Sequence, residues 1–152
     1  MIIQRSLVVS LIGAALIVIS VFLPWIWWTY SMPDFGTHSF SAMGLKTDEG
    51  QLVLLLGLAS IGILFVKQRL LRVGFGLLLA VVILLAIIYF HQRIVSYSLL
   101  LPSDIMQWHT QFGSYIALIG SLVVIAGKLM DLIAKVNEKK QLPPSPLLSS
   151  PS

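Results

Sequence analysis

The sequence predicts an all-α integral membrane protein, a bundle of four transmembrane helices with both the N- and the C-terminus in the cytoplasm. Three observations lead to this prediction. Only 11% of the 152 residues are charged, 57% are hydrophobic and the mean hydropathy is +0.94, whereas a soluble domain carries about 25% charged residues. Polar segments separate four apolar runs. Finally, cations gather at those ends of the runs that would face the cytoplasm.

The first predicted span covers residues 6–28. Its length matches the roughly 20 residues that a helix needs to cross a bilayer core. Arg5 precedes it as in a signal peptide, but the run is too long for one and ends without small residues at a cleavage spacing. We therefore expect an uncleaved helix. Ser6, Ser10 and Ala14 recur every four residues and would form a stripe for close helix contact.

An aromatic cluster closes the first span. Its members, with one tryptophan from further along the chain, are Trp25, Trp27, Trp28, Tyr30 and Trp108. Trp and Tyr favour the membrane–water interface, where the ring meets lipid and its polar edge meets headgroups. We interpret the cluster as interfacial anchors. The alternative is a contact surface for a larger partner or a flat hydrophobic ligand.

An outer loop, residues 29–50, and a short second span, residues 51–67, come next. The loop is rich in glycine and acidic residues and is expected to lack regular structure. Thr47 would cap the helix that follows. The second apolar run is short for a span, but flanking polar side chains can reach the interface. Gly57 suits this helix to close packing.

The third and fourth predicted spans cover residues 73–91 and 112–130. Residues 92–111 between them are predicted to form an outer helical hairpin, because Pro102 is the first strong break and the apolar residues after it keep a helical spacing. The fourth span has glycines every seven residues with a small residue beside them, which predicts the packing seam of the bundle. These residues are Gly113, Ala117, Gly120 and Gly127. Residues 141–152, rich in proline and serine, are predicted to form a disordered cytoplasmic tail.

A short basic stretch between the second and third spans determines the predicted orientation. It contains Lys67, Arg69 and Arg72. With the N-terminus inside, eight of the ten lysines and arginines lie on the cytoplasmic side, and only Lys46 and Arg93 lie outside. A docking patch for an acidic partner or a lipid headgroup is the alternative interpretation of this stretch. The net charge of +4 does not indicate nucleic acid, because the cations are not clustered on one face with aromatic residues.

Two histidines, His91 and His109, are candidates for a cofactor site. In a hairpin that turns near residue 100 they would lie at equal height at the outer boundary of the bilayer. A shared site would hold a metal, a haem- or chlorophyll-type ligand or a proton-sensitive pair. The alternative is that each histidine bonds separately to headgroups, water or backbone. His38 is the only other histidine, so no metal site is predicted and no particular cofactor is indicated.

No motif for catalysis is visible in the sequence. The predicted spans lack charged residues in their central portions, which argues against a pump or an ion-coupled transporter. Phosphate-binding, H-E-x-x-H and G-x-S-x-G motifs and cysteine are also absent. We therefore expect no enzyme activity.

The predicted function is that of a small accessory or structural subunit of a larger membrane complex, located in a prokaryotic inner membrane. Its expected partners are the lipid bilayer and other membrane subunits or further copies of the chain. One alternative is a carrier or pore for a small solute or lipid, which would require oligomerisation through the glycine seam. The histidine cofactor site is the third alternative.

Overall fold

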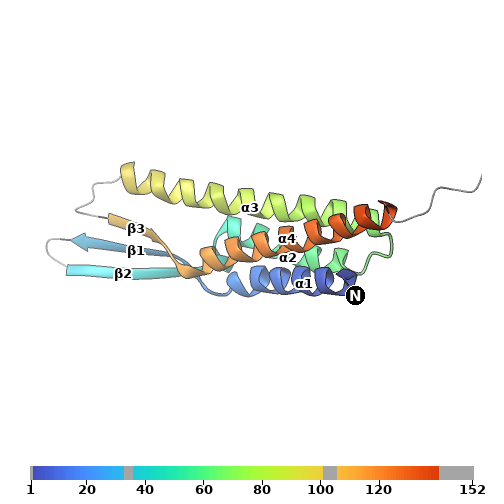
Figure 1. Ribbon diagram of the computed structural model, residues 1–152. Helices are drawn as coiled ribbons and strands as arrows, with labels where there is room; N and C mark the ends of the chain where they lie inside the picture. The colour runs from blue at the N-terminus through green and yellow to red at the C-terminus, as the bar shows by residue number, and fades with distance from the viewer. Residues whose placement is uncertain (1, 33–35, 101–105, 141–152) are drawn as a thin grey trace, which may run out of the picture.

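The computed structural model describes residues 2–32, 36–100 and 106–140, with side chains for residues 5–137 of these (Figure 1). This part of the chain is mostly helical. Its elements are α1 (Ile2–Ser20), β1 (Pro24–Met32), β2 (Gly36–Met43), the 3₁₀ turn η1 (Gly44–Lys46), α2 (Asp48–Ile63), α3 (Arg69–Leu100), β3 (Met106–Thr110) and α4 (Phe112–Lys140). The helices lie side by side in an elongated bundle, and the strands project from one end of it (Figure 1).

The two ends of the bundle differ. The strands and the last turns of α3 lie at one end, which we call the sheet end (Figure 1). The N-terminus, the α2–α3 connection and the end of α4 lie at the other, which we call the basic end because Lys67, Arg69 and Arg72 are there. Within the described residues, α3 and residues Phe112–Asn137 of α4 are long and apolar enough to cross a membrane. The other two predicted spans form shorter helices.

Helices α1 and α4 form the most extensive helix contact, and glycine makes it possible. A Cβ atom on Gly120 would lie 2.9 Å from the Gly13 carbonyl oxygen, and one on Gly13 would lie 2.7 Å from the Gly120 carbonyl oxygen. Two turns further along α4, a Cβ on Gly127 would lie 2.5 Å from Ser10 Oγ. The two backbones therefore touch directly, which only residues without a side chain permit.

The prediction of an all-α fold is wrong, because the first helix is shorter than expected and a sheet follows it. Helix α1 ends at Ser20, and β1 pairs antiparallel with β2 on one side and with β3 on the other. Residues 25–30 are aromatic and β-branched, a composition that favours strands. Pro24 is the first residue of β1, a position where its missing N–H is tolerated.

The predicted irregular loop and the second arm of the predicted helical hairpin are also wrong. Residues 36–43 form β2, and Met106–Thr110 form β3, whose side chains alternate between half-buried and exposed with the period of two that a strand has. The first arm is helical, since α3 continues to Leu100. The predicted turn at Pro102 and the predicted tail, residues 141–152, lie outside the described residues.

Trp25, which was predicted to lie at an interface, is instead the centre of the core beneath the sheet. A shift of register between Pro24 and Ile26 turns it inward, as β-bulges do. Its side chain is fully buried, its indole N–H donates to the Ser20 carbonyl oxygen at 2.8 Å, and its ring meets Phe90 edge-on at 5.2 Å. Gly44 leaves room for it, since a Cβ there would lie 2.6 Å from the indole nitrogen. The buried Trp25 side chain therefore packs β1 of the sheet against α1 and α3 of the bundle.

Candidate functional site: a pocket at the sheet end

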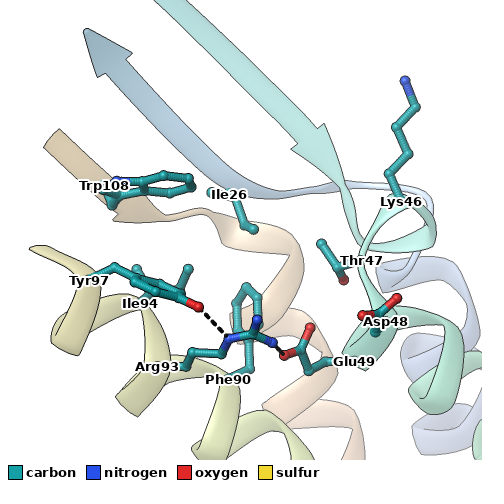
Figure 2. A pocket seen from close by; sticks show the side chains of 10 residues that line it. All are labelled: Ile26, Lys46, Thr47, Asp48, Glu49, Phe90, Arg93, Ile94, Tyr97 and Trp108. Carbon is teal, nitrogen blue, oxygen red and sulfur yellow. Dashed lines mark hydrogen bonds and ion pairs between the residues drawn. The ribbon is translucent and has the colours of Figure 1, made fainter. Parts of the chain in front are cut away.

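A cavity of about 360 Å³ opens at the sheet end where α2 begins (Figure 2). Its size falls within the range of small-molecule sites. The apolar and aromatic lining residues are Ile26, Phe90, Ile94, Tyr97 and Trp108, and the polar ones are Lys46, Thr47, Asp48, Glu49 and Arg93. The pocket thus combines an apolar wall from the sheet and α3 with a charged wall from α2 and Arg93.

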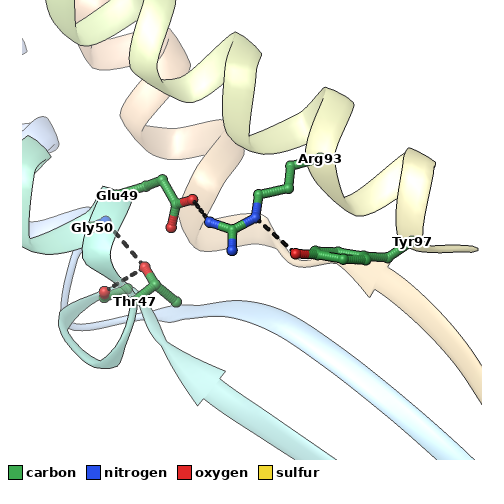
Figure 3. Close-up of polar contacts among 6 residues, drawn as sticks. Thr47, Glu49, Gly50, Arg93 and Tyr97 are labelled. Atoms are coloured by element: carbon green, nitrogen blue, oxygen red, sulfur yellow. Dashed lines mark hydrogen bonds and ion pairs between the residues drawn. The ribbon is translucent and has the colours of Figure 1, made fainter.

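Arg93 bridges the two helices that form the pocket (Figure 3). Its Nη1 donates to Glu49 Oε1 at 2.5 Å, and its Nε donates to the Tyr97 hydroxyl at 3.2 Å. The guanidinium also lies over the Tyr97 ring, 5.6 Å from the centroid. Its other terminal nitrogen, Nη2, has no hydrogen-bond partner among the described residues and lies between the two contacts in Figure 3. The pocket therefore contains the Arg93 cation, held by Glu49 and Tyr97, with an N–H donor on Nη2 that is not used by these contacts.

The capped start of α2 positions Glu49. Thr47 Oγ1 accepts a hydrogen bond from the Gly50 backbone N–H at 3.0 Å and donates to the Gly44 carbonyl oxygen at 2.8 Å (Figure 3). The sequence predicted this cap. It places Asp48 and Glu49 in the first turn, where the helix dipole favours negative charge. The Glu49 side chain is only 14% exposed, whereas that of Arg93 is 43% exposed, so the carboxylate is the more firmly held partner.

A row of aromatic rings crosses one face of the sheet and ends at the pocket. Phe40 stacks on Trp28 at 5.8 Å, Trp28 stacks on Trp108 at 5.4 Å, and Trp108 lies 6.1 Å from Tyr97. The indole nitrogen of Trp108 is buried and has no hydrogen-bond partner in the described part of the chain. Leaving such a donor unpaired costs about 1–3 kcal/mol.

The remaining aromatic residues predicted as interfacial lie on the same strand. Tyr30 packs beside His38 of β2 on the face that carries the aromatic row, 5.9 Å between ring centroids. Trp27 lies on the opposite face and packs beside His109 at 5.4 Å. That opposite face also carries a hydrogen bond of 3.0 Å between the Ser31 and Thr37 hydroxyls.

The two candidate histidines have separate partners. His91 Nδ1 lies 2.9 Å from the Ile87 carbonyl oxygen, its Nε2 lies 3.5 Å from Ser114 Oγ, and its ring meets Tyr115 edge-on at 5.2 Å. His109 is on β3 and packs on Trp27. Among the described residues, no group of three or more His, Cys, Asp or Glu side chains could hold a metal ion. His91 and His109 therefore contact different neighbours.

The residues predicted to pack the helices are all buried, and they lie within one chain. They are Ser6, Ser10, Ala14, Gly57, Gly113, Ala117, Gly120 and Gly127. Most of them line the α1–α4 contact, whereas Gly57 of α2 meets Ile17 of α1, which would lie 3.0 Å from a Cβ there. Gly120 and Gly127 of the glycine seam therefore face α1 of the same chain, whereas Gly113 faces Pro24 and Trp25 at the start of β1.

A charge cluster at the basic end contains a residue that sequence analysis missed. Asp131 is 5% exposed and binds Arg69, whose Nε and Nη2 lie 2.9 and 2.8 Å from Oδ1. Arg72 Nη2 lies 3.6 Å from Oδ2 of the same carboxylate. Lys128 is 4% exposed, with its stem against Gly76. The position of Asp131 between Lys128 and Lys135 of the last helix was the signal that could have indicated this cluster.

Fold and site together define a mostly helical protein with two helices long and apolar enough to cross a membrane and a small sheet that carries a mixed polar and aromatic pocket. No protein-family model matches the chain, and neither a curated protein nor a solved structure matches it.

Proposed function

We propose that the protein spans a membrane four times and acts as a non-catalytic accessory or structural subunit of a larger membrane complex. The observation that carries the membrane placement is the outward direction of the apolar side chains. In the most apolar windows of α3 and α4, only 33% and 39% of the residues are buried. The core helices of a soluble protein bury such side chains, so lipid is the solvent that suits these surfaces.

The interior of the bundle supports the same placement. Its buried polar residues are mainly serines, including Ser10, Ser60 and Ser121, while large leucines such as Leu55 and Leu85 are 67% and 59% exposed. Small residues inside and large apolar residues outside are typical of membrane bundles. The 19 residues of α1 would span about 28 Å and the 16 of α2 about 24 Å, so polar side chains at the ends of α2 would extend to the interfaces.

The charge distribution supports an orientation with the sheet outside the cell membrane. The basic end contains the cations of the α2–α3 connection and of the end of α4, whereas Lys46 and Arg93 are the lysine and arginine at the sheet end. Under the positive-inside rule, the basic end is then cytoplasmic. We extend this placement to a prokaryotic inner membrane, with the basic end in the cytoplasm.

The accessory role is supported by the exposed aromatic face of the β1–β2 hairpin. Within the described residues, strand β2 pairs with β1 and with no other strand, and its Phe40, on the face that carries the aromatic row, is 48% exposed. An exposed aromatic patch on a rigid sheet is typical of a protein-binding surface. The carrier or pore alternative has less support, because the glycines needed for oligomerisation are buried within one chain.

Substituting Phe40 tests this role. Phe40→Ser should lower the yield of co-purifying membrane subunits after mild detergent extraction by roughly tenfold or more, as expected when an aromatic anchor is removed. Ser39→Ala is the matched control, because Ser39 is the neighbouring residue on β2 and points to the other face. Wild-type protein that migrates alone would contradict the accessory role, as would a Phe40→Ser variant that keeps its partners.

A further inference from the structure

A second cavity continues from the sheet-end pocket along the outside of the bundle. It encloses about 440 Å³ between α2 and α3. Its lining residues are Asp48, Glu49, Leu52, Val82, Leu85, Ala86 and Tyr89. Asp48 and Glu49 line both cavities, so a polar pocket and an apolar groove meet at the first turn of α2.

The groove has the shape and chemistry of an acyl-chain site. From Tyr89 to Val82 it follows α3 for about 10 Å toward the basic end. Leu52 and Leu85 are 45% and 59% exposed, so the groove opens to the side of the bundle rather than into its interior. In the proposed membrane, this side faces lipid tails.

At the sheet end of this groove, the pocket places the positive charge of Arg93 next to the carboxylates of Glu49 and Asp48. Arg93 Nη2 is free to donate to an anionic oxygen, and Arg93 is held by Glu49 and Tyr97. Glu49 and Asp48 provide carboxylate acceptors next to it, while the Lys46 ammonium points away from the pocket in Figure 2. The complementary ligand therefore carries one anionic group and, a few bonds away, one cationic N–H group.

We propose that the pocket and groove together bind one phospholipid with an ethanolamine headgroup from the outer leaflet. Its phosphate accepts from Arg93, its ammonium donates to Glu49 and Asp48, and one acyl chain lies along Leu52, Val82 and Leu85. This proposal rests on the membrane placement argued above. A charge-assisted hydrogen bond at each end of the headgroup fixes its orientation.

Two related headgroups fit less well for chemical reasons. A choline headgroup has a quaternary nitrogen without N–H, so it cannot donate a hydrogen bond to Glu49 or Asp48. A glycerol headgroup has no cation, so its phosphate would approach the two carboxylates with an uncompensated negative charge. A preference for ethanolamine over choline and glycerol headgroups therefore distinguishes binding at this site from non-selective binding of lipid around a membrane protein.

The test is native mass spectrometry of the purified full chain with an equimolar mixture of phosphatidylethanolamine, phosphatidylcholine and phosphatidylglycerol that share the same acyl chains. Wild-type protein should retain phosphatidylethanolamine roughly tenfold more than either competitor, the factor expected of one charge-assisted hydrogen bond. Glu49→Gln should reduce phosphatidylethanolamine retention toward that of phosphatidylcholine, and Arg93→Gln should lower the retention of all three lipids.

Two variants on α3 test the groove independently of the headgroup. Leu85→Trp fills the groove and should lower the retention of all three lipids, whereas Ile88→Trp should change nothing. Ile88 is the matched control because it is exposed near the same level of α3 and does not line the groove. Equal retention of the three lipids by the wild-type chain would overturn the proposal, and so would equal behaviour of the two tryptophan variants. If the membrane placement is wrong, thiol labelling of cysteines introduced at the two ends of the bundle will show it independently of lipid retention.

Discussion

Replacing Gly120 by leucine is expected to separate α1 from α4 and to lower the free energy of unfolding by about 3 kcal/mol or more, the upper part of the range for overpacked cores. The Cβ alone would lie 2.9 Å from the Gly13 carbonyl oxygen and 3.0 Å from the Ile17 backbone nitrogen. Both neighbours are backbone atoms, so no side-chain rotation can relieve the clash. The thermal unfolding midpoint of the purified protein in detergent measures the effect.

Gly62→Leu is the matched control for this experiment. Gly62 is exposed on α2, and a Cβ there would meet nothing within 4 Å. Leucine has a higher helix propensity than glycine by roughly 0.5–1 kcal/mol, so this variant should unfold at the same temperature as the wild type or slightly higher. Equal midpoints for the Gly120→Leu and Gly62→Leu variants would show that the α1–α4 contact does not depend on glycine.

Replacing Asp131 by asparagine is expected to destabilise the basic end by about 2–3 kcal/mol. Breaking a buried ion pair from one side typically costs about 3–5 kcal/mol. The effect should fall below that range because the side chains of Arg69 and Arg72 are 23% and 16% exposed to solvent. Asparagine keeps the size of the side chain but removes the negative charge that these arginines share with the buried Lys128. The unfolding midpoint and limited proteolysis of the α2–α3 connection both report the change.

A second substitution distinguishes charge imbalance from lost packing. Lys128→Met on the Asp131→Asn background removes one of the uncompensated cations and should recover part of the lost stability, because methionine fills a similar volume beside Gly76. Asp48→Asn, at an exposed carboxylate, should change stability by less than about 0.5 kcal/mol. A double variant no more stable than Asp131→Asn alone would mean that the cluster does not act through its charge.

The helices could be predicted from the apolar runs, whereas the aromatic residues that form β1 were interpreted as membrane anchors and the sheet was not predicted. Residues 73–91 lie inside α3, and the predicted start of the fourth span at residue 112 agrees with that of α4. Trp27, Trp28 and Tyr30 favour both membrane interfaces and strands, and the sequence alone does not separate the two. The partner that completes the sheet is β3, about 80 residues away, so no local pattern indicated the pairing.

The packing residues were easier to predict than the pocket. A glycine repeat such as Gly113, Gly120 and Gly127 indicates a buried helix face directly, and all three are buried. The pocket instead depends on Arg93 reaching Glu49, which lies 44 residues earlier. Both residues look like ordinary solvated charges in the sequence, and only the antiparallel packing of α2 against α3 brings them together.

The proposed membrane placement, with the sheet outside and the basic end inside, can be tested by thiol labelling of single-cysteine variants. The chain contains no cysteine, so an introduced one is the sole target. Ser39 on β2 and Gln68 between α2 and α3 are both exposed and lie at opposite ends. A membrane-impermeant maleimide should label Ser39→Cys in intact cells and Gln68→Cys only after permeabilisation. Labelling of Gln68→Cys in intact cells, or recovery of either variant in the soluble fraction, would contradict the account.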